Sequence, residues 1–430
     1  MGKSSYNEKK DKEIFWDIYK KIDNEFNLYK DNSYEYLVNF SQAKEPIHRW
    51  FYYQEGYSPQ LITKILNYID IKGKDNFVLD PFAGSGTTLL AAKHSGMRSL
   101  GIEINPFSAF MTKAKTRNYS EKEINQLRNF QVPSRLFEGD VYEKYQLKII
   151  DKLFDREKLE KIELLKQKIR KVKDEKIRDL LFAGLLSILE DVSNYRKGGN
   201  GLKKKRVNRN LDPFREFNRK ISQIHEDLEK EKGGPEPKII NDNCLNMNKY
   251  IKNDIDVSIF SPPYANCFDP FEVYKIELWI GEFVSSYADL RKKRKAALSS
   301  NLNVDLTRNT GNIHRSELLN KILNYLSKQD LWDKRIPRML DAYFFEMNSV
   351  LKLLYNKTKK GGFCIIVVGN SAYGNLAIPT DIILAQIGKK AGFSVEEIIE
   401  ARRNETSSQQ HAKLGNYVEY LRESILVLKK

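Results

Sequence analysis

The chain has 430 residues, which is enough for two or three folding units with a sizeable core. Its 73 Lys and Arg residues exceed its 57 Asp and Glu residues, and 41% of its residues are hydrophobic, which excludes a disordered chain. The resulting net charge of +16 favours a partner that carries phosphates or an anionic membrane surface. A Lys-rich composition from a low-GC genome is the alternative explanation.

The cysteines, the histidines and the lengths of the apolar runs narrow the class of protein further. Cys244, Cys267 and Cys364 include no CxxC pair, which excludes a disulfide framework and makes a zinc site unexpected. The five histidines show no ligand spacing, so we predict no metal. The first residues carry charges but no apolar signal region, and no stretch approaches about 18 apolar residues. We therefore expect a cytoplasmic protein without a membrane partner.

Hydrophobic periodicity predicts the first elements in chain order. A helix is expected near 12–26, and a second over 58–69, where a Pro follows a Ser cap. A short strand over 76–79, a glycine-rich turn, a helix over 87–94 and a strand over 98–105 form a βαβ unit. Such a unit predicts a parallel sheet covered by helices.

The spacing of the apolar residues changes in the middle of the chain. Apolar residues between about 152 and 232 step by three and four positions, which predicts helices, including a more apolar one over 180–189. The segment 194–210 is expected to be a loop, with seven basic residues, three glycines and no acidic residue. Beyond it the pattern predicts strands over 238–240 and 255–260, a basic run at 291–295, a helix over 339–355, and strands over 362–368 and 424–428.

A glycine-rich turn stands between the first predicted strand of the βαβ unit and its helix. It reads Asp80-Pro81-Phe82-Ala83-Gly84-Ser85-Gly86-Thr87-Thr88. Two glycines let the backbone approach a ligand closely, and the N–H groups of a helix start favour anionic groups. Glu103 ends the next strand, about 20 residues further on, where an acid accepts hydrogen bonds from ribose hydroxyls. The third glycine of the dinucleotide fingerprint is missing, which disfavours a nicotinamide oxidoreductase. A tight turn without a ligand is the alternative.

A second motif, Ser261-Pro262-Pro263-Tyr264, directly follows the strand predicted over 255–260. Two prolines fix φ and remove two N–H donors, so the local carbonyls remain as acceptors. The exocyclic amine of a base needs acceptors, and the Ser261 hydroxyl with a neighbouring carbonyl would hold both of its hydrogens. Tyr264 would offer a flat face for stacking to a base rotated out of the duplex. The alternative is a proline-rich strand end with a packed tyrosine.

Together the two motifs resemble motif I and the [DNS]-P-P-[YFW] tetrapeptide of S-adenosylmethionine-dependent methyltransferases that act on amino groups in nucleic acids. The resemblance covers about residues 46–118 and 238–430. It implies a Rossmann-like α/β methyltransferase fold, with a mostly parallel seven-stranded sheet, helices on both faces and a mainly helical basic insertion. It also implies S-adenosyl-L-methionine as the cofactor.

The resemblance also implies a division of the chain and a set of site residues. We expect the cofactor-binding half with amino-terminal helices in 1–150, a helical insertion as candidate target-recognition segment in 151–235, and the catalytic half in 236–430, with a basic and polar insertion at about 285–335. The expected catalytic residues are Ser261, Pro262, Pro263 and Tyr264. The expected cofactor-binding residues are Tyr57, Asp80, Phe82, Ala83, Gly84, Ser85, Gly86, Thr87, Thr88, Glu103, Ile104 and Asp242.

Two of these residues, Tyr57 and Asp242, have ordinary structural alternatives. Tyr57 belongs to a segment that resembles the family's motif X, but an aromatic cluster at a helix start is as often a hydrophobic staple. Asp242 resembles the polar position that contacts the adenine ring, and Asn-Asp-Asn is also an ordinary turn sequence. Both residues remain candidates for cofactor contacts.

The basic segments at 194–210 and 291–295 are the candidate DNA contacts. Contacts to phosphates raise affinity without reading the sequence. A solvated run of charges is the alternative for either segment. The candidate residues are Arg196, Lys197, Lys203, Lys204, Lys205, Arg206, Arg209, Arg291, Lys292, Lys293 and Arg294.

The resemblance implies site-specific methylation of an exocyclic amine of a flipped base in duplex DNA. Family members with Ser first in the tetrapeptide are mostly cytosine-N4 enzymes, so Ser261 favours N4-methylcytosine over N6-methyladenine. No Pro-Cys dipeptide occurs, which excludes cytosine-C5 chemistry. The expected setting is a restriction-modification or defence system, with a restriction endonuclease as a possible second partner. An RNA amino-methyltransferase and a catalytically silent homologue are the remaining alternatives.

Overall fold

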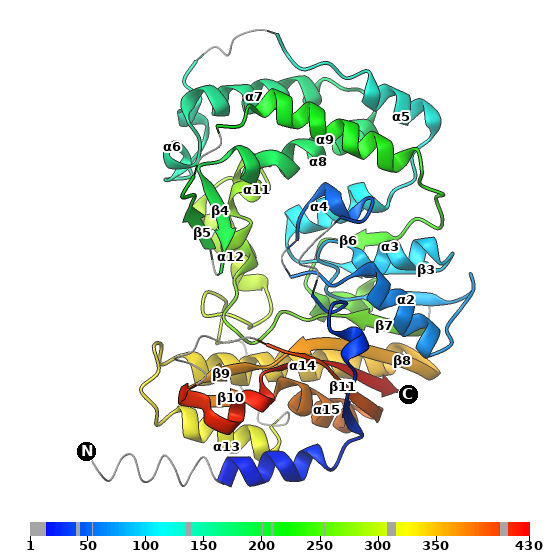
Figure 1. The fold of residues 1–430 in the computed structure, drawn as a ribbon, viewed down its shortest axis with the longest axis vertical. Helices are drawn as coiled ribbons and strands as arrows, with labels where there is room; N and C mark the ends of the chain where they lie inside the picture. Colours follow the sequence, from blue (N-terminus) through cyan, green and yellow to red (C-terminus); the bar gives the residue numbers. More distant parts are fainter. Residues whose placement is uncertain are drawn as a thin grey trace.

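The fold is built on one large sheet. The computed structural model describes residues 14–39, 44–53, 55–134, 139–199, 201–207, 210–252, 254–307, 315–404 and 412–430. Within them an eight-stranded sheet carries helices on both faces (Figure 1). In spatial order its strands are β1 (Leu28–Lys30), β11 (Ser394–Arg403), β12 (Arg422–Lys429), β8 (Thr358–Gly369), β7 (Ile255–Phe260), β2 (Phe77–Asp80), β3 (Arg98–Ile102) and β6 (Lys238–Ile240).

The strand directions are those of a Rossmann-like methyltransferase, which confirms the expected fold class. β6, β3, β2, β7 and β8 run parallel, and β12 is antiparallel to both of its neighbours. β1 adds an eighth strand to the seven expected by pairing in parallel with β11 at the edge of the sheet. Because parallel strands end at the same edge, β2, β3 and β7 deliver the segments that follow them to one place.

The two faces of the sheet bury different cores. Successive side chains of a strand point to opposite faces. On β8, Ile365 and Val367 pack with α2 and α3, whereas Ile366 and Val368 belong to the larger core that includes α14 and α15. The start of α2 is set by Ser58, whose hydroxyl oxygen accepts a hydrogen bond from the backbone N–H of Gln60. The helix expected over 58–69 is thereby confirmed.

Most other elements lie on these faces or in a helical layer beyond the sheet. A helix over 14–23 precedes β1. The remaining helices are α2 (Pro59–Tyr68), α3 (Thr87–His94), α4 (Pro106–Thr116), α5 (Glu121–Arg128), α6 (Ile150–Leu153), α7 (Arg156–Arg170), α8 (Glu175–Val192), α9 (Pro213–Leu228), α10 (Pro270–Val273), α11 (Lys275–Ile280), α12 (Tyr287–Ala296), α13 (Glu317–Leu326), α14 (Ile336–Lys357) and α15 (Thr380–Ala391). Short elements are η1 (Asn32–Tyr34), η2 (His48–Trp50), η3 (Tyr142–Lys144), η4 (Cys244–Lys249), η5 (Gly415–Tyr420) and the hairpins β4 (Tyr195–Gly198) with β5 (Gly201–Lys204) and β9 (Ser371–Tyr373) with β10 (Leu376–Ile378).

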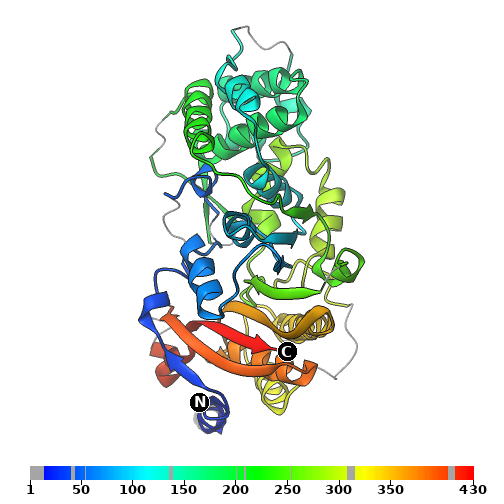
Figure 2. The ribbon, with the colours of Figure 1, turned by 90° about the vertical axis from the view of Figure 1, so that its right-hand side faces the viewer.

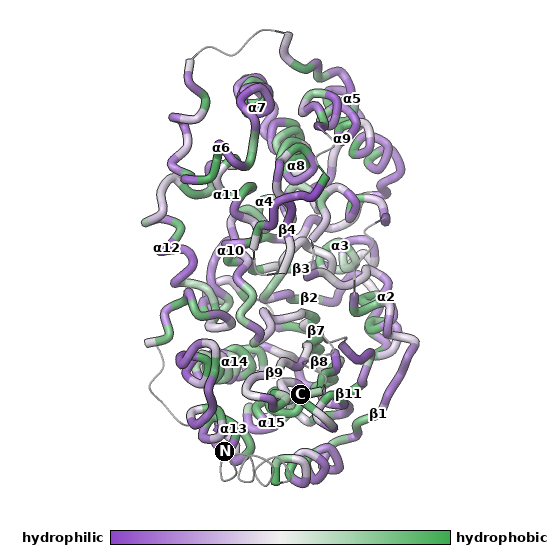
Figure 3. The backbone as a smooth tube through the Cα atoms, turned by 60° about the vertical axis from the view of Figure 1, so that its left-hand side comes forward, coloured by the Kyte–Doolittle hydropathy of each residue, from purple (hydrophilic) through white to green (hydrophobic). Residues whose placement is uncertain are grey.

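The helical layer lies at the top of Figure 1 and contains α5 to α9. Figure 2 shows the same layer above the sheet in a second view. α8 packs against α9, α7 and α5 within the layer, and against α4 and α11 toward the sheet. Hydrophilic residues predominate along α12, whereas α8 carries long hydrophobic stretches (Figure 3). No described helix has the length and apolar character needed to cross a membrane.

The segment 194–210 differs from the expectation of a loop. Its first half is the antiparallel hairpin of β4 and β5, with Gly198 paired to Gly201. Gly199 has a φ of +60°, which a glycine adopts without strain and which a tight turn needs. The sequence of these charged strands carries no β signal. The pairing of the strands is supported by a tertiary contact, because β5 packs on α10.

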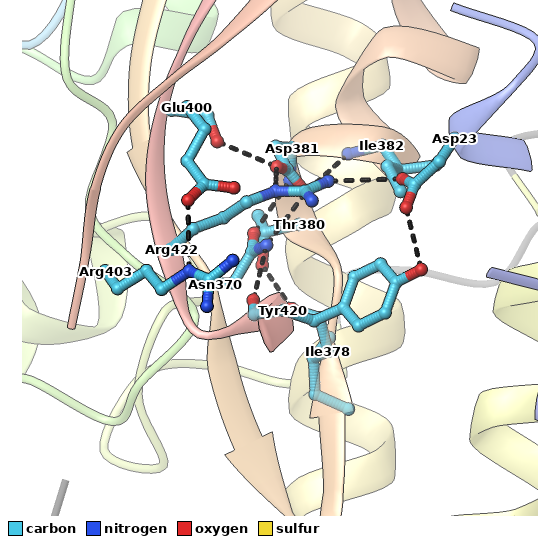
Figure 4. Close-up of polar contacts among 11 residues, drawn as sticks. Asp23, Asn370, Ile378, Thr380, Asp381, Ile382, Glu400, Arg403, Tyr420 and Arg422 are labelled. Carbon is cyan, nitrogen blue, oxygen red and sulfur yellow. Dashed lines mark hydrogen bonds and ion pairs between the residues drawn. The ribbon is translucent and has the colours of Figure 1, made fainter. Parts of the chain in front are cut away.

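A buried ion cluster attaches the amino-terminal helix to the carboxy-terminal strands (Figure 4). Arg422 Nε lies 2.7 Å from Asp381 Oδ2, and Arg422 Nη2 lies 3.3 Å from Asp23 Oδ1. Asp23 also accepts a 2.7 Å hydrogen bond from the Tyr420 hydroxyl, and the Asn370 side-chain amide donates to Asp381. Asp381 is fully buried, and its charge is compensated by the guanidinium, the amide, the Ser424 hydroxyl and the Ile382 backbone N–H.

Asp381→Ala is expected to lower the free energy of unfolding by about 3–5 kcal/mol, because it leaves the buried Arg422 guanidinium with only Asp23, at 3.3 Å, to compensate its charge. Burial by itself would raise the pKa of Asp381, but Arg422 and the hydrogen bonds hold that pKa below its ordinary value. A carboxyl with a depressed pKa stabilises the fold above the unfolded pKa. That stability is lost as the pH falls through the folded pKa.

Denaturant unfolding at neutral pH and at about pH 3.5 checks this prediction. The control is Glu317→Ala, which removes an exposed partner of Lys321 and is expected to cost less than about 1 kcal/mol. Equal unfolding free energies for wild type and Asp381→Ala at neutral pH would contradict the role of the cluster.

Candidate active site

The two sequence motifs line one pocket at the edge of the sheet where β2, β3 and β7 end. The cavity has a volume of about 330 Å³. Its wall includes residues after β2, after β3 and after β7, three segments that are far apart in the sequence. The expected site residues that line it are Tyr57, Phe82, Ala83, Gly84, Ser85, Thr87, Glu103, Ile104, Ser261, Pro262, Pro263 and Tyr264.

The glycine-rich turn is shaped by its two glycines. Gly84 has a φ of +50° and Gly86 a φ of +84°, which are left-handed conformations that other residues rarely adopt. A Cβ on Gly86 would lie 2.7 Å from Thr112 Cγ2, and the Thr112 hydroxyl donates a 2.9 Å hydrogen bond to the Gly84 carbonyl. Contacts with α4 therefore fix the conformation of the turn, and residues of the turn form part of the pocket wall.

Glu103 lies at the end of β3 and is only 8% exposed. The backbone N–H of Gly84 donates to its Oε2 at 2.8 Å, and that of Asn105 donates to its Oε1 at 2.7 Å. Each carboxylate oxygen keeps capacity for a further donor. Burial raises the pKa of Glu103 to about 7, although both backbone hydrogen bonds oppose this rise. The carboxylate thus lines the pocket with spare acceptor capacity, and its contact with two ribose hydroxyls stays a prediction.

Asp80, Gly86 and Thr88 belong to the turn but do not line the pocket. Asp80 is 1% exposed and accepts a 2.9 Å hydrogen bond from the Phe82 backbone N–H. Burial raises its pKa to about 7. Thr88 shares a hydrogen bond with the Tyr57 hydroxyl. These residues therefore hold the turn in shape, and a contact of theirs with a cofactor stays a prediction.

Asp242 is also not among the residues that line the pocket, and its contact with a cofactor stays a prediction. Its carboxylate accepts hydrogen bonds from the Asn246 amide at 3.0 Å and from the Tyr250 hydroxyl at 2.5 Å. The next two residues, Asn243 and Cys244, line the cavity and were not predicted. Their position one step along the same turn is the signal that could have found them.

The tetrapeptide also lines the pocket and is held by its last residue. A Cβ on Gly369 would lie 2.7 Å from Tyr264 Cε2, so the tyrosine ring packs on the bare backbone of β8. The Tyr264 hydroxyl donates to Glu423. Burial, and then the Glu423 carboxylate, raise the pKa of Tyr264 well above its usual range, so the hydroxyl stays a donor. Glu423 and Arg402 also line the pocket, and Glu423 was not predicted from the sequence.

Lys197 is a correction to the predicted DNA contacts. It is 2% exposed, and its Nζ lies 3.0 Å from Glu190 Oε2 and also contacts Glu277. The same ammonium lies 5.2 Å from the ring centroid of Tyr274, which stacks on the pocket residue Tyr53. Enclosed by two carboxylates and aromatic rings, Lys197 anchors the hairpin and has no surface to offer a phosphate.

Apart from Arg209, the other predicted basic residues are either paired within the protein or exposed to solvent. Arg294 pairs with Asp269 and Glu272 at 2.9 Å each, and Lys205 donates to backbone carbonyls at the end of α8. Lys293 lies 3.8 Å from Asp289 on the same helix, and Arg209 is outside the described residues. The exposed candidates are Arg196, Lys203, Lys204, Arg206, Arg291 and Lys292.

Both basic segments adjoin the segment that follows the tetrapeptide. β5 packs on α10, and Arg294 of α12 pairs with residues at the start of the same short helix. The residues after α12 then enter the pocket wall, beginning with Ala297 and Leu298. The exposed cations therefore lie on elements that pack against or lead into segments of the pocket wall, and their contacts with phosphates stay a prediction.

Replacing Lys203, Lys204 and Arg206 with glutamine is expected to reduce the slope of log Kobs against log salt concentration. The reduction is about one unit for each of these side chains that binds a phosphate in the wild-type complex. The slope falls because DNA releases fewer counterions on binding when fewer protein cations contact its phosphates. Fluorescence anisotropy with duplex DNA across a salt series measures the slope.

The matched control replaces Lys72, Lys74 and Lys389 with glutamine. These three exposed lysines precede β2 and β11, at the opposite edge of the sheet. The net charge changes equally in both variants, so an identical change of slope would remove the hairpin from the DNA interface.

Comparisons with known proteins point to DNA methyltransferases. A family model described as DNA methylase matches residues 2–113, and one described as D12 class N6 adenine-specific DNA methyltransferase matches residues 59–232. Type II methyltransferase M.BsoBI of Geobacillus stearothermophilus is 28% identical, over 92% of this chain and 88% of its own. Type II methyltransferase M.AvaI of Nostoc sp. is 27% identical over 92% and 89%. Type II methyltransferase M.MvaI of Kocuria varians is 24% identical over 98% and 97%.

The fold and the shared pocket define a Rossmann-like methyltransferase, a class that takes its methyl group from S-adenosyl-L-methionine. The two family matches and the type II methyltransferase relatives support an S-adenosylmethionine-dependent DNA amino-methyltransferase. The residues present fit this cofactor. The buried Glu103 lies in the pocket wall with acceptor capacity for a ribose, and Gly84 brings bare backbone to the same wall beside the Tyr53 ring.

Proposed function

We propose that this enzyme methylates the exocyclic N4 of a cytosine rotated out of duplex DNA, as the modification enzyme of a type II restriction-modification system. The observation that carries the proposal is the single pocket lined by Glu103, by the glycine-rich turn and by Ser261 to Tyr264. A cofactor site and an amine-binding tetrapeptide within one cavity are what direct transfer between two bound molecules requires.

The chain's own residues supply position and acceptors for the reaction. When bound, S-adenosyl-L-methionine supplies an electrophilic methyl group. The Ser261 hydroxyl and a carbonyl of the tetrapeptide accept the two N4 hydrogens, which directs the nitrogen lone pair to the methyl carbon. Tyr264 provides the surface beside the base. The nitrogen would form the new bond to the methyl carbon as the carbon–sulfur bond breaks, with S-adenosylhomocysteine as the leaving group. One amine proton would pass to solvent, and no enzyme-bound intermediate is needed.

The choice of cytosine over adenine rests on Ser261. A neutral serine does not balance charge on the amine as an aspartate would, and the resemblance links serine in this position mostly with cytosine-N4 enzymes. Adenine-N6 is the second candidate, because one family match is described as N6 adenine-specific. That match covers 59–232 and ends before the tetrapeptide, so it does not include the residue on which the choice depends.

The modification role is proposed from the relatives. Three of them carry the name type II methyltransferase, and each alignment spans more than nine-tenths of this chain. Such an enzyme protects a short sequence from an endonuclease that cuts the same sequence. A cognate endonuclease is accordingly the proposed partner of this chain.

Incubation of the full chain with labelled S-adenosyl-L-methionine and unmodified genomic DNA, followed by nucleoside mass analysis, tests the proposal. N4-methylcytosine is the expected product, and Ser261→Ala is the negative control. N6-methyladenine would replace the proposal by the second candidate, and absence of any labelled nucleoside would reject both. Sequencing of the modified DNA then gives the recognition site for all later assays.

A further inference from the structure

Arg402 and Glu423 form an ion pair in the wall of the pocket that no catalytic step described above uses. Arg402 Nε lies 2.7 Å from Glu423 Oε2, and the other carboxylate oxygen accepts from the Tyr264 hydroxyl. Glu423 is 4% exposed, so its charge depends on these two donors. The chain of contacts from Arg402 to Glu423 to Tyr264 joins the pair to the tetrapeptide.

The sheet register aligns the three residues. Arg402 on β11 pairs with Glu423 on β12, and Glu423 pairs with Gly369 on β8, the glycine under the Tyr264 ring. The register between β11 and β12 shifts between Glu400 and Arg402, which marks a bulge. A bulge inserts one extra residue and turns the next side chain to the other face of the strand. Here it turns Arg402 into the pocket.

The Arg402 guanidinium is only partly used by the protein. Its Nε is committed to Glu423, while its two terminal nitrogens have no hydrogen-bond partner in the described part of the chain. The side chain is 27% exposed and lines the cavity. A guanidinium held at Nε presents a planar pair of donors in a fixed direction, which suits two neighbouring acceptors.

We propose that Arg402, held in place by Glu423, selects cytosine by donating from its terminal nitrogens to N3 and O2 of the flipped base. This inference rests on the proposed function. Beside its exocyclic amine, cytosine presents two adjacent acceptors. Adenine presents N1 followed by a C–H group, so the second donor would face no acceptor and would remain unpaired in a confined site. Arg402 is thus a specificity residue, and Glu423 is a positioning residue.

The first test compares Arg402→Gln with Arg403→Gln on a duplex that carries the recognition site. Arg403 is the neighbour on the same strand, is 54% exposed and pairs with Glu400, away from the pocket. Arg402→Gln is expected to lower kcat/KM about 100-fold, the loss of hydrogen bonds from a charged donor. Arg403→Gln should stay within about twofold of wild type. Affinity for S-adenosylhomocysteine, measured by calorimetry, should not change in either variant.

The second test changes the base. Target cytosine is replaced by 3-deazacytosine, which lacks the N3 acceptor, or by 2-thiocytosine, whose sulfur accepts hydrogen bonds poorly. Wild type and Arg403→Gln should lose activity on both analogues relative to cytosine. Arg402→Gln should show little further loss, because the donors that read these positions are already absent. Glu423→Gln should lie between them, with a raised KM for DNA and unchanged affinity for S-adenosylhomocysteine.

Two results would overturn the inference. One is wild-type kcat/KM for Arg402→Gln, and the other is wild-type enzyme that treats both analogues like cytosine, which requires no variant to fold. Failure of the proposed function is seen separately, since the nucleoside analysis of wild-type product would give N6-methyladenine before any variant is made.

Discussion

Ser261→Ala is expected to lower kcat about 100- to 1000-fold, because it removes an acceptor placed where charge develops on the amine during transfer. The cofactor turn and Glu103 lie on other strands and keep their own hydrogen bonds, so cofactor affinity should not change. Single-turnover methylation with labelled cofactor measures the loss, and calorimetry with S-adenosylhomocysteine measures the affinity.

Companion variants separate chemistry from folding. Ser285→Ala changes an exposed serine before α12 and should leave kcat within about twofold. Tyr264→Ala removes the ring that packs on Gly369 and should abolish transfer with the cofactor still bound. Wild-type turnover by Tyr264→Ala on duplex DNA would contradict the role of the ring.

Glu103→Ala is expected to weaken cofactor binding about 100-fold, because a buried acceptor of two ribose hydroxyls is removed and two backbone donors lose their partner. Those donors are the N–H groups of Gly84 and Asn105. Calorimetric titration gives the Kd. Glu103→Gln keeps the shape and should lose less, and Glu121→Ala, an exposed acid on α5, is the control. A Glu103→Ala enzyme with wild-type Kd would reject the ribose contact.

The same residue predicts a pH dependence of cofactor affinity. Only the ionised carboxylate accepts hydrogen bonds at both oxygens. Burial raises the pKa of Glu103 to about 7 in the free enzyme, so protonation competes with binding below that pH. Affinity should therefore fall as the pH drops from about 8 to about 6, and the fall should be absent in Glu103→Gln.

The local elements could be predicted because their signals are local. The Ser58-Pro59 cap, the strands 238–240 and 255–260 and the helix 87–94 appear in the structure with bounds that differ by at most one residue. The motifs were also readable, since the glycine turn and the proline pair restrict the backbone whatever surrounds them. Chain order alone then brought Glu103 and the tetrapeptide to one edge of a parallel sheet.

Lys197 and Arg402 show what a single sequence does not decide. Both are basic residues in charged stretches with no visible signal, and a single sequence does not distinguish a buried cation from an exposed one. Lys197 is buried by carboxylates from α8 and α11, and Arg402 is turned by a bulge toward a glutamate on another strand. Pairing between distant segments decides both cases.

The sequence by itself determined the class of reaction, because the turn at Gly84 and the tetrapeptide at Ser261 carry their chemistry in their own backbones. Tertiary structure alone decided which charges serve the site. A charge has a role only through its distance to other charges and to solvent, and folding sets those distances. Thus Lys197 became a structural anchor, whereas Arg402 and Glu423 came to line the pocket beside Tyr264.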